Sequence, residues 1–557
     1  MAVSSKLDGF LMNLLSAHSA LAGNRENFAL PGSIHGKYVT VDAVAKNGNG
    51  AELLAEMRRH GLTHGAYYGG MASGEMPIAQ VGALTHIVDL SFAREDAFVT
   101  NKISPLPPQD VQALGSTEAG VAVKTPNGQT VTIDGTGVTV GIISDSFNTL
   151  GRHENMRTDI CNGLLPADTH ILQDYPHGTD EGRALGQLVH EIAPGASILF
   201  ATAFYGEASF AENIIRLAQH GAKVIIDDVG YFDEPAYQDG VIAQAVDYVT
   251  SHYGVTYLSA AGNDAGNGYE GAFTPGVFRY GRVYNNFTPG QAPHYYLPVV
   301  IPAHDDVVFI LEWAQPAASA SPGHGASSQL DLILARGHGG AVGISGAPTI
   351  GHDPFQGIEF INNLGHARVM KLAVTWRGGT IPADFKLMAL DNGAGVKLGD
   401  FSSNINHGTI YGHPAAAGAV SIGADFIGDT PGYGTNPPRS EYYSSLGPTE
   451  IWFQPNGLPY PSPLERGGPG LMAPDGADTT FLGFQINDGD KLPNFFGTSA
   501  AVGAAGAVDA LVREADPLLT ASQGIDILQA TAFPQPDAAA GLIRAGVAVH
   551  LAWDLFT

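Results

Sequence analysis

The sequence predicts an α/β protein whose main body is a doubly wound, mostly parallel sheet, joined by an inserted β-sandwich and a small N-terminal α/β domain. Three observations predict it. Apolar strand-like runs alternate with helical periodicity over about 136–270, as in parallel sheets. Over about 270–408 the helical period is replaced by short apolar segments between Gly, Pro and Ser clusters, which is typical of a sandwich. The sheet pattern then resumes at 418–424.

The composition is that of a large, acidic, turn-rich globular protein. Its 557 residues include 72 glycines and 35 prolines, 44% are hydrophobic, and the net charge is −27. This charge argues against binding to nucleic acid, which draws on Lys and Arg facing phosphates, and against anionic membrane surfaces. No run of 18 apolar residues predicts a membrane span. Cys161 is the single cysteine, so an intrachain disulfide and a thiolate metal cluster are excluded.

The first residues carry Lys6 and an apolar stretch over 10–15. Asp8, Asn13 and His18 interrupt this stretch, which favours an amphipathic helix over a signal peptide. We therefore expect a protein that is cytoplasmic, or secreted without a clear signal peptide.

Residues 1–125 are predicted to form the N-terminal helix and a small α/β unit in the order strand, helix, strand, helix, strand. Apolar alternation and helical spacing place these elements at 38–41, 51–60, 64–68, 78–84 and 86–90. The proline-rich segment 105–108 supplies a linker.

The main sheet is predicted in two parts, 126–270 and 409–557, separated by the sandwich at 271–408. Its expected strands are 138–144, 196–203, 222–229 and 255–261, and its expected helices are about 181–192, 209–220 and 239–252. Functional residues of such sheets lie at the carboxyl ends of the strands.

The strongest chemical signal is the segment 496–501, Phe-Gly-Thr-Ser-Ala-Ala, followed by a helix of small residues through Leu511. A nucleophilic serine needs an exposed hydroxyl and nearby backbone donors for an oxyanion. Ser499, placed at a helix N-terminus, would have both. Gly-Thr-Ser also occurs in ordinary loops, so this motif alone decides nothing.

Two further motifs end predicted strands. The buried segment 140–146, Val-Gly-Ile-Ile-Ser-Asp-Ser, terminates in Asp145, and the segment 259–266, Ser-Ala-Ala-Gly-Asn-Asp-Ala-Gly, contains Asn263. Taken singly, a capping aspartate and a turn asparagine explain both.

In this order, the motifs resemble those of the subtilase and sedolisin superfamily of serine peptidases, over about 135–270 and 408–550. The segments 412–417, 443–448 and 472–476 fit the same order. The resemblance implies a subtilisin-like fold, a peptide or protein substrate, a prodomain over 1–125 that docks on the active-site face, and no cofactor. It implies Ser499 as nucleophile, Asn263 as oxyanion donor and Asp145 as partner of the base. No acidic loop at a recognisable spacing follows Ser499, so no metal is expected.

The residue that acts as general base is harder to identify from the motifs. Subtilases open a helix with His-Gly-Thr-His, whereas this chain has His177-Gly-Thr-Asp-Glu181. Sedolisins place a glutamate on this helix and close it with a similar Ala-Pro-Gly-Ala. Glu181 precedes Ala193 of that closing motif by twelve residues, at the sedolisin spacing, but the sedolisin aspartate one turn later is Leu185 here. The resemblance thus implies a sedolisin-like subgroup with a subtilisin-like oxyanion asparagine, in which Glu181 is the general base and Asp145 orients it or shares its proton.

Two alternatives stay open. One is the same peptidase with a conventional Asp145–His177–Ser499 triad. The other is an inactive subtilase-like scaffold whose sandwich binds protein or glycan. A further prediction concerns Asp228 in the segment 224–230, which resembles the strand that pairs with bound peptide. Asp228 is expected to line the first specificity pocket and to favour a basic or polar side chain.

Overall fold

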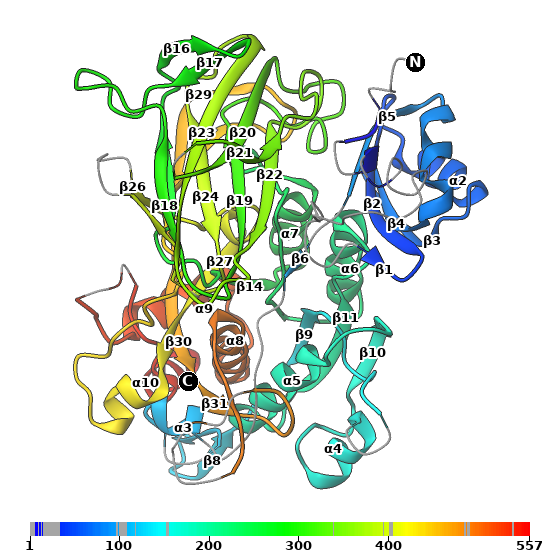
Figure 1. Cartoon of the computed structure of the whole chain (residues 1–557). Helices are drawn as coiled ribbons and strands as arrows, with labels where there is room; N and C mark the ends of the chain where they lie inside the picture. Colours follow the sequence, from blue (N-terminus) through cyan, green and yellow to red (C-terminus); the bar gives the residue numbers. More distant parts are fainter. Residues whose placement is uncertain are drawn as a thin grey trace.

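The computed structural model describes residues 6–8, 11, 12, 14, 34–95, 98, 99, 109–116, 119–151, 155–337, 339–393, 395–399, 405–483, 486, 491–536, 538 and 540–557. Its centre is a seven-stranded sheet of order β10-β11-β9-β12-β14-β27-β30, in which every neighbouring pair is parallel (Figure 1). The strands are β9 (Thr139–Ser144), β10 (His170–Gln173), β11 (Ser197–Thr202), β12 (Val224–Asp227), β14 (Thr256–Ala260), β27 (Ala419–Phe426) and β30 (Leu471–Asp475).

Helices cover both faces of this sheet, which is why its central strands are apolar throughout instead of alternating. Val140 and Ile142 of β9 pack beneath α5 (Glu181–Ile192) and α8 (Thr498–Ala515). Ile143 points to the opposite face, against α6 (Glu207–Gln219) and α7 (Val241–Tyr253).

The small residues of α8 let this helix lie close to the sheet. A Cβ added to Gly506 would come within 2.4 Å of Ile226 Cγ2 on β12. Glycine is therefore required at this crossing, and the close packing fixes where the N-terminus of α8 meets the ends of the strands.

The predicted sandwich is present as two antiparallel sheets that share one apolar core (Figure 1). One has the order β22-β19-β24-β15-β26 and the other β16-β17-β23-β18-β25, with β20 and β21 added beside β23. Their bounds are β15 (Gly268–Gly271), β16 (Pro275–Arg279), β17 (Arg282–Asn285), β18 (Leu297–Ile301), β19 (Asp306–Trp313), β20 (Ser328–Arg336), β21 (Ala341–Ser345), β22 (Phe355–Ile361), β23 (Arg368–Gly379), β24 (Phe385–Leu390), β25 (Lys397–Leu398) and β26 (Ile405–His407). The predicted fold class, a parallel α/β sheet with additional antiparallel sheets, is confirmed.

The N-terminal sheet has the order β1-β2-β4-β3, with β5 on the other edge of β2. It consists of β1 (Ile34–His35), β2 (Tyr38–Ala45), β3 (Thr63–Tyr68), β4 (Met71–Pro77) and β5 (Leu90–Glu95), with α2 (Gly50–Arg59) and a 3-10 helix η1 (Ile78–His86). Two expectations were wrong here. Strand β4, with the sequence Met-Ala-Ser-Gly-Glu-Met-Pro, was not predicted, and the strand expected at 86–90 begins only at Leu90.

The remaining described elements are short hairpins, short helices and the C-terminal helices. They are α3 (Gln109–Ala113), β7 (Val121–Lys124), β8 (Thr130–Ile133), α4 (Met156–Asn162), η2 (His413–Ala415), η3 (Ile427–Asp429), η4 (Pro431–Tyr433), β28 (Thr449–Phe453), β29 (Pro459–Arg466), β31 (Ala477–Asp478), β32 (Asn494–Phe495), α9 (Ala521–Thr531) and α10 (Ala545–Phe556). The expected linker at 105–108 and most of the expected N-terminal helix lie outside the described residues. Within the described part of the chain, no helix has the length and apolar character needed to cross a membrane.

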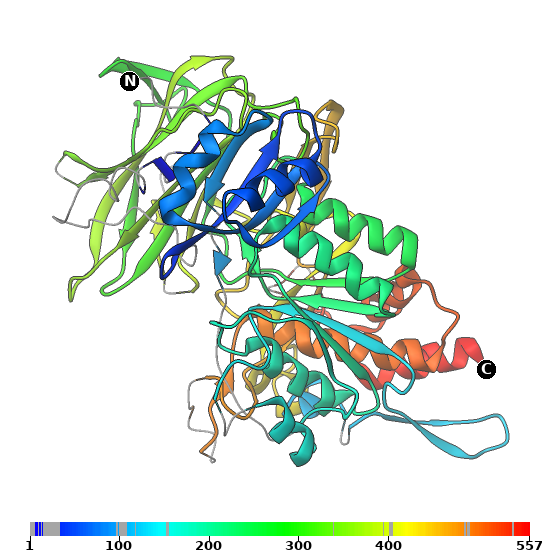
Figure 2. The ribbon, with the colours of Figure 1, turned by 90° about the vertical axis from the view of Figure 1, so that its right-hand side faces the viewer.

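One buried arginine joins the N-terminal unit to the other two parts of the chain. Figure 2 shows the ribbon of this unit against the sandwich and the helices of the main sheet. Arg94 of β5 lies 2.8 Å from Glu207 on α6, 2.7 Å from Asp233 after β13 (Gly230–Tyr231) and 2.6 Å from Asp353 before β22. A fourth carboxylate, Asp42 on β2, lies 3.8 Å away. One guanidinium therefore compensates four buried carboxylates drawn from three regions of the chain.

Candidate active site

Asp145, the residue that follows β9, caps the N-terminus of α5. Its Oδ1 accepts hydrogen bonds from the backbone N–H groups of Ser146 and Glu181, the latter at 2.9 Å. Its Oδ2 accepts from the Thr179 N–H and from the Thr179 hydroxyl at 2.7 Å. Burial raises the pKa of Asp145, and these hydrogen bonds act in the opposite direction. Asp145 therefore holds the backbone of Glu181, the residue that begins α5.

The carboxyl group that faces the Glu181 side chain is Asp228, which directly follows β12. Both residues are buried. The Asp228 carboxyl interacts with the side chains of Glu181 and Ser144, at a looser geometry than a standard hydrogen bond. Burial raises the pKa of Asp228 well above its ordinary value, helped by the nearby charges of Asp145 and Asp227. The contacts with Ser144 and Glu181 act in the opposite direction on the Asp228 pKa. Asp228 therefore keeps its proton at pH values where an exposed aspartate has lost it, and the two neighbouring carboxyl groups can share one proton.

His177, the alternative base, lies elsewhere. Its ring is exposed and meets the Tyr175 ring edge-on, with centroids 5.8 Å apart. In a conventional triad the aspartate bonds the histidine ring. Among the described residues, however, the Asp145 carboxylate has all of its hydrogen bonds with Ser146, Thr179 and Glu181. The geometry favours Glu181 over His177.

Ser499 lies in the first turn of α8, where the helix dipole favours negative charge. Its side chain is fully buried, and its hydroxyl has no hydrogen-bond partner among the described residues. The neighbouring Thr498 is tied to Asn263, whose Oδ1 accepts from the Thr498 N–H and hydroxyl at 3.0 Å each. Asn263 thus lies beside the turn that carries Ser499.

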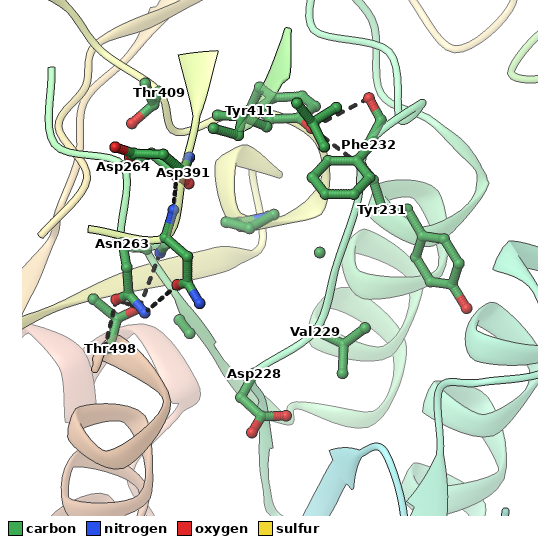
Figure 3. Close-up of a pocket in the computed structure, with 18 of the residues that line it drawn as sticks. Asp228, Val229, Tyr231, Phe232, Asn263, Asp264, Asp391, Thr409, Tyr411 and Thr498 are labelled. Atoms are coloured by element: carbon green, nitrogen blue, oxygen red, sulfur yellow. Dashed lines mark hydrogen bonds between the residues drawn. The ribbon is translucent and has the colours of Figure 1, made fainter. Parts of the chain in front are cut away.

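The Asn263 side chain also reaches the inserted sandwich. Its Nδ2 donates to Oδ1 of Asn392, at 3.2 Å, on the loop that follows β24 (Figure 3). An asparagine amide has two N–H donors, so the second one stays available for a ligand oxygen. Gly497 permits this approach: with φ at +105°, it would place an added Cβ 3.0 Å from Asn263 Nδ2.

A cavity of about 460 Å³ opens beside these residues, between the carboxyl edge of the parallel sheet and the sandwich (Figure 3). The sheet contributes Asp228, Asn263 and Thr498 to its lining, and the sandwich contributes Asp305 and Asp391. Asp228, which was predicted to line a specificity pocket, and Asn263, which was predicted to donate to the oxyanion, therefore line the same cavity.

An N-terminal segment reaches the rim of this cavity. Strand β6 (Phe98–Val99) pairs antiparallel with β13 (Gly230–Tyr231), in the register Gly230 to Val99 and Tyr231 to Phe98. Gly230 and Tyr231 themselves line the cavity. The backbone edge next to Asp228 is therefore able to pair with an extended peptide, and in the intact chain it pairs with β6.

Among the described residues, one group of carboxylates has the spacing of a metal site, formed by Asp42, Glu207 and Asp233. Arg94 lies within this group, 2.8 Å from Glu207 and 2.7 Å from Asp233. Its guanidinium supplies the positive charge that an ion would otherwise bring.

The chain was compared with known families, curated proteins and solved structures. No family model and no curated protein matches it. Similar solved structures include fervidolysin from Fervidobacterium pennivorans, described as a keratinolytic enzyme related to subtilisin, with 12% identity and a TM-score of 0.40 over 95% of this chain. The match spans 64% of the length of fervidolysin.

Two further solved structures are similar at a comparable level. The MycP3 protease of the type VII (ESX-3) secretion system has 16% identity and a TM-score of 0.33, covering 81% of this chain and 93% of its own. MycP1 from Mycobacterium smegmatis has 12% identity and a TM-score of 0.33, covering 81% and 89%. With so few identical residues, the chemistry of this chain has to be inferred from its own side chains.

Proposed function

We propose that this chain is a serine endopeptidase of the subtilisin-like fold that forms an acyl-enzyme on Ser499. The observation that carries the proposal is the buried carboxyl pair of Glu181 and Asp228, next to the cavity that Thr498 and Asn263 line. A buried pair of this kind is costly for folding alone, and shared protons are typical of acid–base sites.

In the proposed mechanism, the Ser499 hydroxyl attacks a peptide carbonyl and Glu181 takes its proton. Asp228 stays protonated and hydrogen-bonds Glu181, which keeps the pair at one negative charge. The developing oxyanion accepts hydrogen bonds from the Ser499 N–H and from the second N–H of Asn263, donors of a kind worth about 10²–10³-fold each in kcat. Protonated Glu181 then gives its proton to the leaving amine, and a water molecule repeats the sequence to release the acyl group.

The N-terminal unit fits the role of a prodomain in this proposal. Its strand β6 occupies the backbone edge of Gly230 and Tyr231, where a substrate would pair, and Ser499 is fully buried in the intact chain. Release of this segment is therefore expected to precede activity.

The first test is covalent labelling of the serine. A site for a specific protease is inserted between residues 99 and 109. The chain is folded intact, cut, separated from the N-terminal segment, and exposed to a fluorophosphonate probe. Labelling is expected after the cut, at one residue, and should disappear in Ser499→Ala. The matched control Ser251→Ala, on the exposed face of α7, should label normally. A cut, folded chain that takes no label would contradict the proposal and favour a scaffold that binds protein or glycan.

A second test concerns Asp228. Because its pKa is raised, activity should fall on the alkaline side as Asp228 loses its proton and a second charge appears beside Glu181. Asp228→Asn keeps an N–H donor but cannot ionise, so this alkaline fall should vanish, while kcat drops by about 10–100-fold because an amide orients the base less well. The pH dependence of kcat on one peptide measures both effects. Asp554→Asn, an exposed change on α10, is the control, and an unchanged alkaline limb in Asp228→Asn would remove Asp228 from the mechanism.

A further inference from the structure

The cavity beside the proposed nucleophile is strongly acidic. Six carboxyl groups line it, and the described lining residues include no lysine, arginine or histidine. The sheet side contributes Asp228, Glu234 and Asp264, and the sandwich side contributes Asp305, Asp306 and Asp391.

Two of the sheet-side carboxyl groups already have side-chain partners within the chain. Glu234 lies 2.7 Å from Nδ1 of the buried His413, whose pKa is raised to about 10, with burial opposing the effect of Glu234 and Asp227. Asp228 interacts with Glu181. These two carboxyls therefore have roles that do not require a ligand.

The sandwich-side carboxyls are different. Asp391 and Asp305 are only 5% and 6% exposed, yet Oδ1 of Asp391 and Oδ2 of Asp305 have no hydrogen-bond partner among the described residues. Buried carboxylate oxygens are normally paired, because leaving them unpaired costs free energy. Both residues line the cavity, so these oxygens are placed to meet a ligand donor.

Asp264 adds a third carboxyl to this end of the cavity. Its Oδ1 accepts from the backbone N–H groups of Asp391 and Asn392, at 2.9 and 3.0 Å, and Figure 3 shows it next to Asp391. Burial, together with the charge of Asp391, raises the pKa of Asp264 to about 7 and that of Asp305 to about 6. Among the described residues that line the cavity, none is a lysine, arginine or histidine that could balance the charge of Asp264, Asp305 and Asp391.

The spacing of this cluster suits an extended cation better than a metal ion. Among the described residues, the only group of three whose ligand atoms all lie within 4.8 Å of one another is Asp42, Glu207 and Asp233, which does not include these carboxyls and already contacts Arg94. A guanidinium group presents five N–H donors in a planar fork and can reach several carboxylates at once.

Apolar side chains line the rest of the cavity. They are Val229, Phe232, Val308, Leu390 and Tyr411. Apolar walls with an acidic end match a side chain that has an aliphatic stem and a charged head.

We propose that this cavity receives the arginine or lysine side chain of the peptide residue whose carbonyl Ser499 attacks, and that the inserted sandwich recognises its charge through Asp305 and Asp391. The proposal rests on the proposed function, because the attacked residue is placed by Asn263 and Thr498 at the cavity wall. It assigns the sandwich a direct part in substrate choice.

The test compares peptides that differ only at the attacked residue, with arginine against citrulline, its uncharged counterpart of the same shape. The cut enzyme should prefer arginine by about 10²-fold in kcat/KM, and Asp305→Asn with Asp391→Asn should lower this ratio by about 10-fold or more. Asp526→Asn, exposed on α9, should leave the ratio unchanged. In parallel, calorimetry on the Ser499→Ala chain measures binding of the same two peptides, independently of cleavage.

The outcomes separate the two proposals. Cleavage with equal rates for arginine and citrulline, or a ratio unaffected by the double substitution, overturns the cationic pocket and leaves the peptidase standing. Preferential binding of the arginine peptide without any cleavage or labelling supports the pocket and contradicts the peptidase. Tight Ca²⁺ binding that the same two substitutions abolish would assign the cluster to a metal and overturn the proposal.

Discussion

Glu181→Gln should lower kcat/KM by about 10³-fold or more on any peptide that the cut enzyme cleaves, because glutamine keeps the shape of the side chain but cannot accept the serine proton. The fold should survive, since the backbone N–H of residue 181 still caps onto Asp145. His177→Ala should change the rate by no more than about threefold, as expected for an exposed loop residue.

The comparison requires both variants and a control measured across pH on one peptide. Glu212→Gln, on the exposed face of α6, makes the same chemical change away from the cavity and should be silent. The reverse order, a silent Glu181→Gln with an inactive His177→Ala, would establish the conventional triad. The Asp145→Asn substitution cannot distinguish Glu181 from His177 as the base, since Asp145 holds the start of α5 under either mechanism.

Arg94→Gln should cause the largest loss of stability, about 3–5 kcal/mol in the free energy of unfolding, because it removes the one cation among four buried carboxylates. The loss should be greater at pH 8 than at pH 5. Burial raises the folded-state pKa of Asp42 to about 6 and that of Asp233 to about 7, so both carboxyls take up protons as the pH falls through this range and their mutual repulsion disappears.

Denaturant unfolding of the uncut chain at the two pH values measures this effect. Arg59→Gln, an exposed change on α2 that loses only a surface ion pair with Glu56, should cost less than about 1 kcal/mol. An Arg94→Gln chain as stable as the native one at pH 8 would mean that the carboxylates are compensated in another way.

Five of the seven strands of the main sheet were predictable because their signals are local, whereas β10 and β30 were not predicted. The apolar runs of β9, β11, β12 and β14 each end in a turn, and the helices between them have clear periodicity, so both were found within one or two residues. Strand β4 was missed for the opposite reason. Its Gly74, at φ +153°, and its Glu75, which pairs with His64, suit a strand only in the context of the neighbouring strands.

In the candidate site, too, some features could be predicted from local sequence and others could not. Ser499, Asn263 and Glu181 follow from motifs, since each lies where a strand or helix begins or ends. The contact between Asp228 and Glu181 joins a strand end to a helix start, and the only signal for it in the sequence is two consecutive carboxyls, Asp227-Asp228, at the end of an apolar run. Asp145 was the partner that the family resemblance implied, and in the structure its oxygens accept hydrogen bonds from backbone donors and Thr179.

The first and last strands of the sandwich, β15 and β26, pair with each other, with Gly268 opposite His407. The insertion is therefore a closed loop in itself, and the entropy of bringing β14 next to β27 depends on two short tethers, 261–267 and 408–418, instead of on the whole intervening chain. Those tethers carry Asn263 and Asp264 on one side and Thr409 and Tyr411 on the other, all of which line the cavity. Any hinge movement of the sandwich relative to the sheet must pass through these residues, so it would change the width of the cavity and the aim of the Asn263 amide together.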